Sequence, residues 1–324
     1  QNGFVDNVSS MSFVWDAGAA CLPATVIGNP TANGIYQPSQ LGGGSAFDGT
    51  ASDPALAGVS DRLNKVQFHL SFLAGGASYY WTGSAFSSYT VTDATAWRDV
   101  TAGTDSWRNN FDSNKWISDR YYYLKTRAFD KAEPLGANGG NEQADPWTLR
   151  NFTVDGTAPV SAISTPVTGG FITASLATIS GTTYGGLSGL VAGAGGLKLR
   201  IFHDYGGSRY FWRGTTALGG WSTTFTDLPV TFAAVATTTT WTYPAPTYDP
   251  PVISTNGQVY QFVIEGVDLA GNVEVGSTMT VTADFIGPTV ALSTPMAGSN
   301  AFYGPSRPMP TLIGDAIDSP AGIS

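Results

Sequence analysis

Alternation of apolar and polar residues is the dominant pattern along this chain. It is clearest over 66–72, 197–201 and 258–264, where every second side chain is apolar. A period of two is typical of half-buried β-strands. Apolar stripes at helical spacing are absent, and Gly and Pro interrupt the sequence about every ten residues. The pattern predicts an all-β protein of short antiparallel strands.

One short motif recurs three times and marks the joints between repeats. Phe152–Pro159 reads FTVDGTAP, Val281–Pro288 reads VTADFIGP, and a less regular copy runs from Phe13 to Pro23. The prolines that close the three copies lie 136 and then 129 residues apart. This spacing is the length of a domain and exceeds the about 20 to 50 residues of a solenoid repeat. The chain is therefore predicted to be an array of β-sandwich domains.

Further landmarks keep the same spacing inside the repeats. Gly49-Thr50 precedes Gly181-Thr182 by 132 residues, and Tyr79–Trp81 precedes Tyr210–Trp212 by 131 residues. Trp81 and Trp212 are expected to anchor the two cores because they occupy the same place within strands. The predicted domains are the last strand of a preceding repeat with a linker at 1–18, repeat one at 19–156, repeat two at 157–286, and the start of an incomplete third repeat at 287–324.

Two segments look irregular at this level. Residues 84–120 are interpreted as a long connection that carries tryptophans, and Thr237–Thr240 with the prolines that follow as an extended loop. The ends are ragged, with an orphan strand at 11–16 and too few residues after 287 for a sandwich of about 100 residues. Either the chain is one part of a longer array of repeats, or subunits lend strands to each other. The first explanation is favoured, because the two terminal segments together have too few residues to complete a sandwich.

The joint motif, together with Asp268–Asn272 (DLAGN) and Gly49–Asp53 (GTASD), resembles tandem bacterial Ig-like repeats of large secreted adhesins and cell-surface proteins. The resemblance covers nearly the whole chain. It implies tandem Ig-like β-sandwiches outside the cell. The sequence departs from the pattern at Lys131–Glu133, where Leu-Ala-Gly-Asn is expected, and at Tyr184, which replaces an Asp.

Composition narrows the range of partners. The 324 residues are 42% hydrophobic and only 12% charged, with a net charge of −9. The acidic balance argues against nucleic acid or an anionic membrane surface as partner. Cys21 is the single cysteine, so no disulfide forms within the chain. No apolar run spans a membrane, and the start at Gln1 suggests a processed or excised chain.

Residues for an enzyme site are sparse. The chain has two histidines, His69 and His203. His69 aligns with Arg200 at an outward strand position and is expected to face solvent. The four glutamates, Glu133, Glu142, Glu265 and Glu274, are scattered without an evident pairing for a two-carboxylate hydrolase. The chain is therefore predicted not to be an enzyme.

The aspartates are the candidate metal ligands. In an Ig-like sandwich the loops after the second and sixth strands lie at the end where the chain enters. Carboxylates there are expected to converge on the incoming joint, and hard oxygen ligands suit Ca²⁺. The alternative is that Asp is simply favoured at turns and strand ends. The candidate Ca²⁺ ligands at the joints are Asp16, Asp53, Asp130, Asp155, Asp268, Asp284 and Asp318.

Together these features predict a non-enzymatic structural or adhesive segment of a large extracellular surface protein, such as a stalk, fibre or surface layer. Its partners are then neighbouring repeats or other copies of the same protein. The alternative is a glycan-binding accessory module of a secreted carbohydrate-active enzyme, because flat aromatic faces stack on sugars. Four tryptophans without clear counterparts in the other repeat are the candidate glycan contacts: Trp97, Trp107, Trp116 and Trp147.

Overall fold

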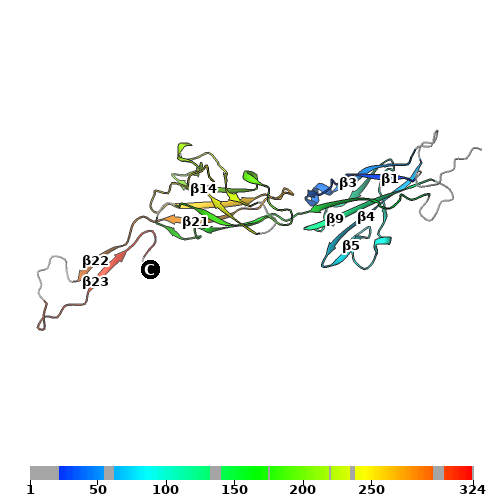
Figure 1. Cartoon of the computed structure of the whole chain (residues 1–324). Helices are drawn as coiled ribbons and strands as arrows, with labels where there is room; N and C mark the ends of the chain where they lie inside the picture. Colours follow the sequence, from blue (N-terminus) through cyan, green and yellow to red (C-terminus); the bar gives the residue numbers. More distant parts are fainter. Residues whose placement is uncertain are drawn as a thin grey trace, which may run out of the picture. The chain divides into compact units, whose positions relative to one another are not determined.

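The computed structural model describes residues 22–54, 62–131, 140–173, 176–218, 220–233, 238–294 and 303–322. The predicted orphan strand at 11–16 lies outside them. The chain divides into two compact units, residues 1–156 and 157–324. The helices in the described residues are single 3₁₀ turns, and none has the length or apolar character of a membrane span. The remaining regular structure is β, as the alternation predicts (Figure 1).

Repeat one is a sandwich of two sheets. The smaller sheet has the order β1-β3-β8, with β1 Ala24–Asn29, β3 Gly43–Ser52 and β8 Ser106–Phe111. The larger has the order β2-β10-β9-β4-β5-β6, with β2 Gly34–Tyr36, β10 Thr148–Val154, β9 Arg120–Asp130, β4 Leu63–Ala74, β5 Ala77–Trp81 and β6 Phe86–Ser87. Outside this path, β7 (Arg98–Asp99) pairs with β4. Three 3₁₀ turns lie at Pro38–Leu41, Asp93–Thr95 and Ser113–Lys115.

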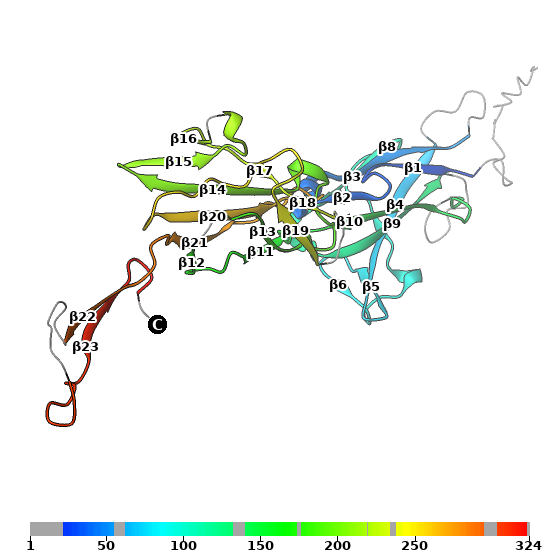
Figure 2. The same ribbon diagram turned by 60° about the vertical axis from the view of Figure 1, so that its left-hand side comes forward.

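Repeat two has the same architecture (Figure 2). Its smaller sheet has the order β11-β13-β19-β18, with β11 Val160–Thr165, β13 Ile179–Tyr184, β19 Thr239–Tyr243 and β18 Thr231–Phe232. The larger has the order β12-β21-β20-β14-β15-β16, with β12 Phe171–Ile172, β21 Ser277–Ala283, β20 Val259–Gly266, β14 Leu197–Tyr205, β15 Ser208–Trp212 and β16 Trp221–Ser222. Here β17 (Leu228–Pro229) pairs with β14. Two 3₁₀ turns lie at Gly193–Gly195 and Thr216–Leu218.

This strand order is that of the immunoglobulin variable-type sandwich. Strands A, B and E form one sheet, and G, F, C, C′ and C″ form the other, with a short strand parallel to G at its edge. Each repeat also has a tyrosine corner. The Tyr122 hydroxyl donates to the Ile117 carbonyl at 3.0 Å. Tyr260 is its buried equivalent in repeat two, near the backbone of Ser254 and Thr255. Tandem Ig-like β-sandwiches are therefore the observed fold.

Residues 287–324 contribute one hairpin, with β22 at Thr289–Thr294 and β23 at Ile313–Ile317. Their antiparallel pairing matches that of β11 and β13, and a Cβ atom on Gly314 would meet the main chain of the facing strand. That the hairpin begins a third repeat stays a prediction.

Two sequence interpretations were wrong at the E strands. Residues 84–120 contain β8 and two short strands, and the threonine run leads directly into β19. In β8 the polar Asn109 takes an inward position, which hides the alternation. In β19 the threonines are exposed or half-buried and only Trp241 and Tyr243 are buried, and the polar threonines were mistaken for a loop although Thr suits a strand.

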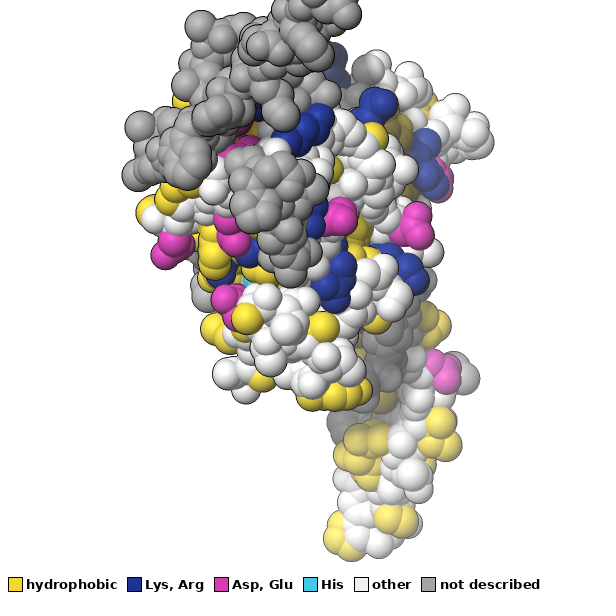
Figure 3. All heavy atoms as spheres, turned by 90° about the vertical axis from the view of Figure 1, so that its right-hand side faces the viewer, with side chains coloured by type: hydrophobic (Ala, Val, Ile, Leu, Met, Phe, Trp, Pro, Cys, Tyr) yellow, Lys and Arg dark blue, Asp and Glu magenta, His cyan; other side chains and the backbone are white. Residues whose placement is uncertain are grey.

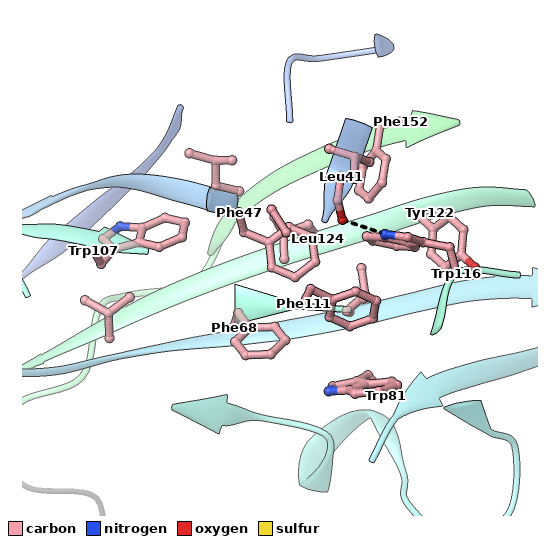
Figure 4. Packing of buried hydrophobic residues seen from close by; sticks show 14 of the residues in the cluster. Leu41, Phe47, Phe68, Trp81, Trp107, Phe111, Trp116, Tyr122, Leu124 and Phe152 are labelled. Atoms are coloured by element: carbon pink, nitrogen blue, oxygen red, sulfur yellow. Dashed lines mark hydrogen bonds between the residues drawn. The ribbon is translucent and has the colours of Figure 1, made fainter. Parts of the chain in front are cut away.

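The surface agrees with the low charge of the sequence. In Figure 3 basic and acidic side chains are interspersed over the face shown, and neither sign gathers in one patch. The core of each repeat is built from large aromatic and aliphatic residues, and Figure 4 shows that of repeat one. As predicted, Trp81 and Trp212 belong to these cores, with exposed fractions of 7% and 0%.

Candidate functional site

A tryptophan lies across a glycine in the smaller sheet of each repeat. Trp107 of β8 pairs with Gly49 of β3, and Trp241 of β19 pairs with Gly181 of β13. A Cβ atom on Gly181 would lie 2.8 Å from the Trp241 ring and would overlap the Ala162 carbonyl oxygen. Both indole N–H groups donate to main-chain carbonyls, at 3.1 and 3.2 Å. The glycine of the Gly-Thr landmark therefore recurs because only glycine fits beside the tryptophan ring and the facing main chain.

An aspartate closes the loop after strand F in each repeat by binding an asparagine. The Asp268 carboxylate accepts hydrogen bonds from the main-chain N–H and side-chain amide of Asn272, at 2.7 and 2.8 Å. The Asp130 carboxylate accepts the same pair from Asn141, at 2.6 and 2.9 Å. The sequence comparison missed Asn141 because repeat one has a longer loop here. We call these the Asp–Asn clasps.

Arg62 contacts both Asp53 and the residue that follows Asp130. The Asp53 carboxylate is 3.0 Å from the Arg62 guanidinium, and both side chains are buried. The main-chain N–H of Lys131, next to Asp130, donates to the Arg62 carbonyl at 2.9 Å. A guanidinium thus compensates the charge of Asp53 in this loop region.

The other predicted ligands also serve the local structure. Asp155 is fully buried, and its main-chain N–H donates to the Tyr36 carbonyl. The Asp284 carboxylate accepts from the N–H groups of Ile286 and Ala321, at 3.2 and 3.1 Å. Asp318 Oδ1 is buried and has no hydrogen-bond donor among the described residues. Asp16 lies outside those residues.

Within the described ranges, no three His, Cys, Asp or Glu side chains come close enough to share a metal ion. Inside each repeat, an asparagine donates to the clasp carboxylate, and in repeat one Arg62 pairs with Asp53. The pairing of Asp155 with Asp268 involves both units and stays a prediction. If it binds Ca²⁺, millimolar Ca²⁺ raises the melting temperature, a chelator lowers it, and Asp268→Ala reduces the response. A melting temperature that changes with neither Ca²⁺ nor chelator would contradict the predicted site.

The described glutamates act as structural acceptors. Glu142 pairs with Arg127 at 2.6 Å, and Glu265 pairs with Arg200 at 2.9 Å. Glu274 accepts from the main-chain N–H groups of two residues, at 2.6 and 3.0 Å. Glu133 lies outside the described residues.

Three of the four predicted glycan contacts are buried, so the expectation that they are exposed was wrong. Trp97, Trp107 and Trp116 have exposed fractions of 8%, 1% and 7%, and only Trp147 is half-buried. Trp107 also has a counterpart, because it is equivalent to Trp241. The Trp116 indole N–H donates to the Leu41 carbonyl at 2.8 Å inside the core (Figure 4).

His69 is buried, which corrects the expectation that it faces solvent. Alternation places it on the outer face of β4, but the segment that carries Asp93 and Trp97 covers that face. His69 Nε2 lies 3.2 Å from Asp93 Oδ1, and its ring packs against Trp97. The Arg127 guanidinium lies over Trp97, 4.1 Å from the ring centroid. These contacts form a structural cover over the sheet.

Acid is expected to destabilise repeat one through His69. Burial lowers the pKa of His69, although Asp93 opposes the shift. Because its folded pKa lies below the unfolded value of about 6.5, the unfolded chain takes up the proton first, and stability is lost as pH falls below about 6.5. His69→Gln should flatten the melting temperature between about pH 7 and 5. An unchanged slope would contradict this role. His203→Gln is the matched variant in repeat two, where burial also lowers the pKa of the histidine. It should not change the pH dependence of repeat one.

An open cleft lies at one edge of repeat one, between β8 of the smaller sheet and β5 and β7 of the larger. Its volume is about 710 Å³. Phe68, Trp81 and Phe111 form its floor, and Asn109 and Asn110 of β8 form one wall. A second hollow, of about 720 Å³, lies beside Gly28, Gly49 and Trp107.

Comparison with known proteins adds little to this picture. No protein-family model and no curated protein sequence matches the chain. Among solved structures, it is similar to fibronectin(III)-like modules of Clostridium thermocellum CbhA, with 9% identity, coverage of 80% of this chain and 94% of that one, and a TM-score of 0.26. It is also similar to Rst D1-D2, with 9% identity, 81% and 99% coverage and a TM-score of 0.32.

A marsupial T cell receptor is a further match, with 11% identity, 83% and 77% coverage and a TM-score of 0.29. TM-scores this low carry no weight, and the assignment of the fold rests on the strand order.

Proposed function

We propose that this chain is a non-enzymatic segment of an extracellular surface protein in which Ig-like repeats serve as spacers. One observation carries the proposal: the features that recur between the two repeats all serve folding. The glycine under the tryptophan, the Asp–Asn clasp and the tyrosine corner appear in both. Selection for a repeated, self-contained module explains why these features are duplicated.

Single-molecule stretching of the full chain tests the spacer role. Two independent modules should give two main unfolding events, each lengthening the chain by about 400 Å, since about 130 residues extend to about 3.5 Å each. A single event that releases both lengths together would contradict independent modules. Turnover of glycan or peptide substrates by the purified chain would contradict the non-enzymatic assignment.

The second candidate function is a glycan-binding module. Three of the four tryptophans predicted to contact glycans are buried, but the cleft at the edge of repeat one supports this function independently.

A further inference from the structure

In repeat two a tyrosine occupies the corresponding edge of the sandwich. Tyr243 of β19 fills the space between the sheets and is fully buried. Its hydroxyl accepts a hydrogen bond from Trp212 Nε1 at 3.1 Å and donates to the Asp249 carbonyl at 2.8 Å. The Tyr243 ring and its hydroxyl thus cover Trp212, the tryptophan of strand C′ in repeat two.

The equivalent residue in repeat one is Asn109. Tyr243 pairs with Ile179, two residues before Gly181, and Asn109 pairs with Phe47, two residues before Gly49. Trp81 is likewise equivalent to Trp212. The shorter Asn109 side chain does not replace the tyrosine ring, and the cleft of about 710 Å³ lies at this place.

Two polar groups line the cleft, the Asn109 amide and the Trp81 indole. Asn109 is only 3% exposed, and its Nδ2 donates to the Asn110 carbonyl at 3.0 Å. Its Oδ1 is a hydrogen-bond acceptor and the indole N–H is a donor. A hydroxyl group can accept from the indole and donate to the amide oxygen, as the Tyr243 hydroxyl both accepts and donates in repeat two.

The rim indicates a neutral ligand with several hydroxyl groups. It carries two cations, Arg98 and Lys115, and two carboxylates, Asp99 and Asp112, so its formal charges cancel. Arg98 is held in place by the carbonyl groups of three residues at 2.6 to 3.0 Å. Such fixed polar groups reduce the entropy cost of binding.

Main chain also lines the cleft beside Asn110. Gly43 and Gly44 lie where β3 bulges away from β8, and a Cβ atom on Gly43 would meet nothing within 4 Å. A ligand can therefore approach the backbone closely here. The floor is aromatic, with Phe68, Phe111 and Trp81 lying together at this side of the core (Figure 4).

From these features we infer that the cleft binds one ring of a neutral saccharide. The apolar face of the sugar lies toward the aromatic floor, and its hydroxyl groups bond to Asn109, Trp81 and the rim. The volume is within the range of about 300 to 1,000 Å³ that is usual for small-molecule sites. This activity goes beyond the spacer role and does not depend on it, because the cleft lies within repeat one.

The test is a titration of the ¹⁵N-labelled full chain with neutral hexose and N-acetylhexosamine oligosaccharides at millimolar concentration. The Trp81 indole N–H resonance should shift saturably with at least one of them. Asn109→Tyr should abolish the shift, because it supplies the tyrosine found in repeat two. Asn110→Ala, at the exposed rim, should weaken binding about tenfold without affecting folding.

Tyr121→Ser is the matched control, since Tyr121 is an aromatic residue on β9 that is 57% exposed and lies away from the cleft. It should leave binding unchanged. Three results would overturn the inference: no shift with any saccharide, binding unaffected by both Asn109→Tyr and Asn110→Ala, or loss of binding in Tyr121→Ser. Binding of N-acetyltyrosinamide without binding of any saccharide would also overturn it, because the site would then take a phenol side chain of a protein partner.

Discussion

Gly181→Ala is expected to unfold repeat two at temperatures where the native chain is folded. The added methyl group would overlap the Ala162 carbonyl oxygen and lie 2.8 Å from the Trp241 ring. Neither neighbour can move easily, because the carbonyl belongs to the paired strand β11 and the ring is fully buried. We expect a loss of about 4 kcal/mol, near the upper end for point substitutions. For a domain of this size that lowers the melting temperature by about 15 °C.

Hydrogen exchange measured by mass spectrometry can assign the effect to one repeat. Peptides from 157–286 should lose protection in Gly181→Ala, while those from repeat one keep it. Gly287→Ala is the control, because a Cβ atom there would meet nothing within 4 Å. A change below about 0.5 kcal/mol in Gly181→Ala would show that the sheet yields at this position and that the glycine is not a packing requirement.

Local patterns in the sequence were enough to predict much of the fold. Alternation marked β14 and β20, because these strands bury one face and leave the other partly exposed. It also marked β4, although both faces of that strand are buried over 66–72. Repeat spacing identified equivalent positions such as Trp81 and Trp212 without any knowledge of their surroundings. Strand β8 escaped detection because Asn109 occupies an inward position, and that polar residue takes part in the cleft rather than in the apolar core.

Other features depend on contacts that sequence spacing does not encode. His69 lies on the outer face that alternation predicts, but its burial comes from residues 24 to 28 positions later, at Asp93 and Trp97. The clasp partner of Asp130, Asn141, was missed because its loop differs in length from the loop in repeat two. A sequence comparison that aligned Trp107 with Trp241 would have found both E strands, and it would have shown that Asn109 stands where repeat two has Tyr243.

The last expectation concerns the Asp–Asn clasp, which holds the loop after strand F. Asp268→Ala should destabilise repeat two by about 3 kcal/mol. The carboxylate is fully buried and accepts two hydrogen bonds from Asn272. Bonds to a charged group contribute about 1.5 to 3 kcal/mol each, and the substitution also leaves the Asn272 main-chain N–H without its acceptor.

Denaturant unfolding of Asp268→Ala, Asn272→Ala and the double variant measures the clasp directly. Because the two side chains act as one unit, the double variant should cost little more than Asp268→Ala alone. Asp130→Ala is the matched variant in repeat one, and hydrogen exchange should show its effect in peptides before residue 157 and not after it. Additive losses in the double variant would mean that Asp268 and Asn272 stabilise the loop separately, and the clasp would then not be the unit that the two repeats share.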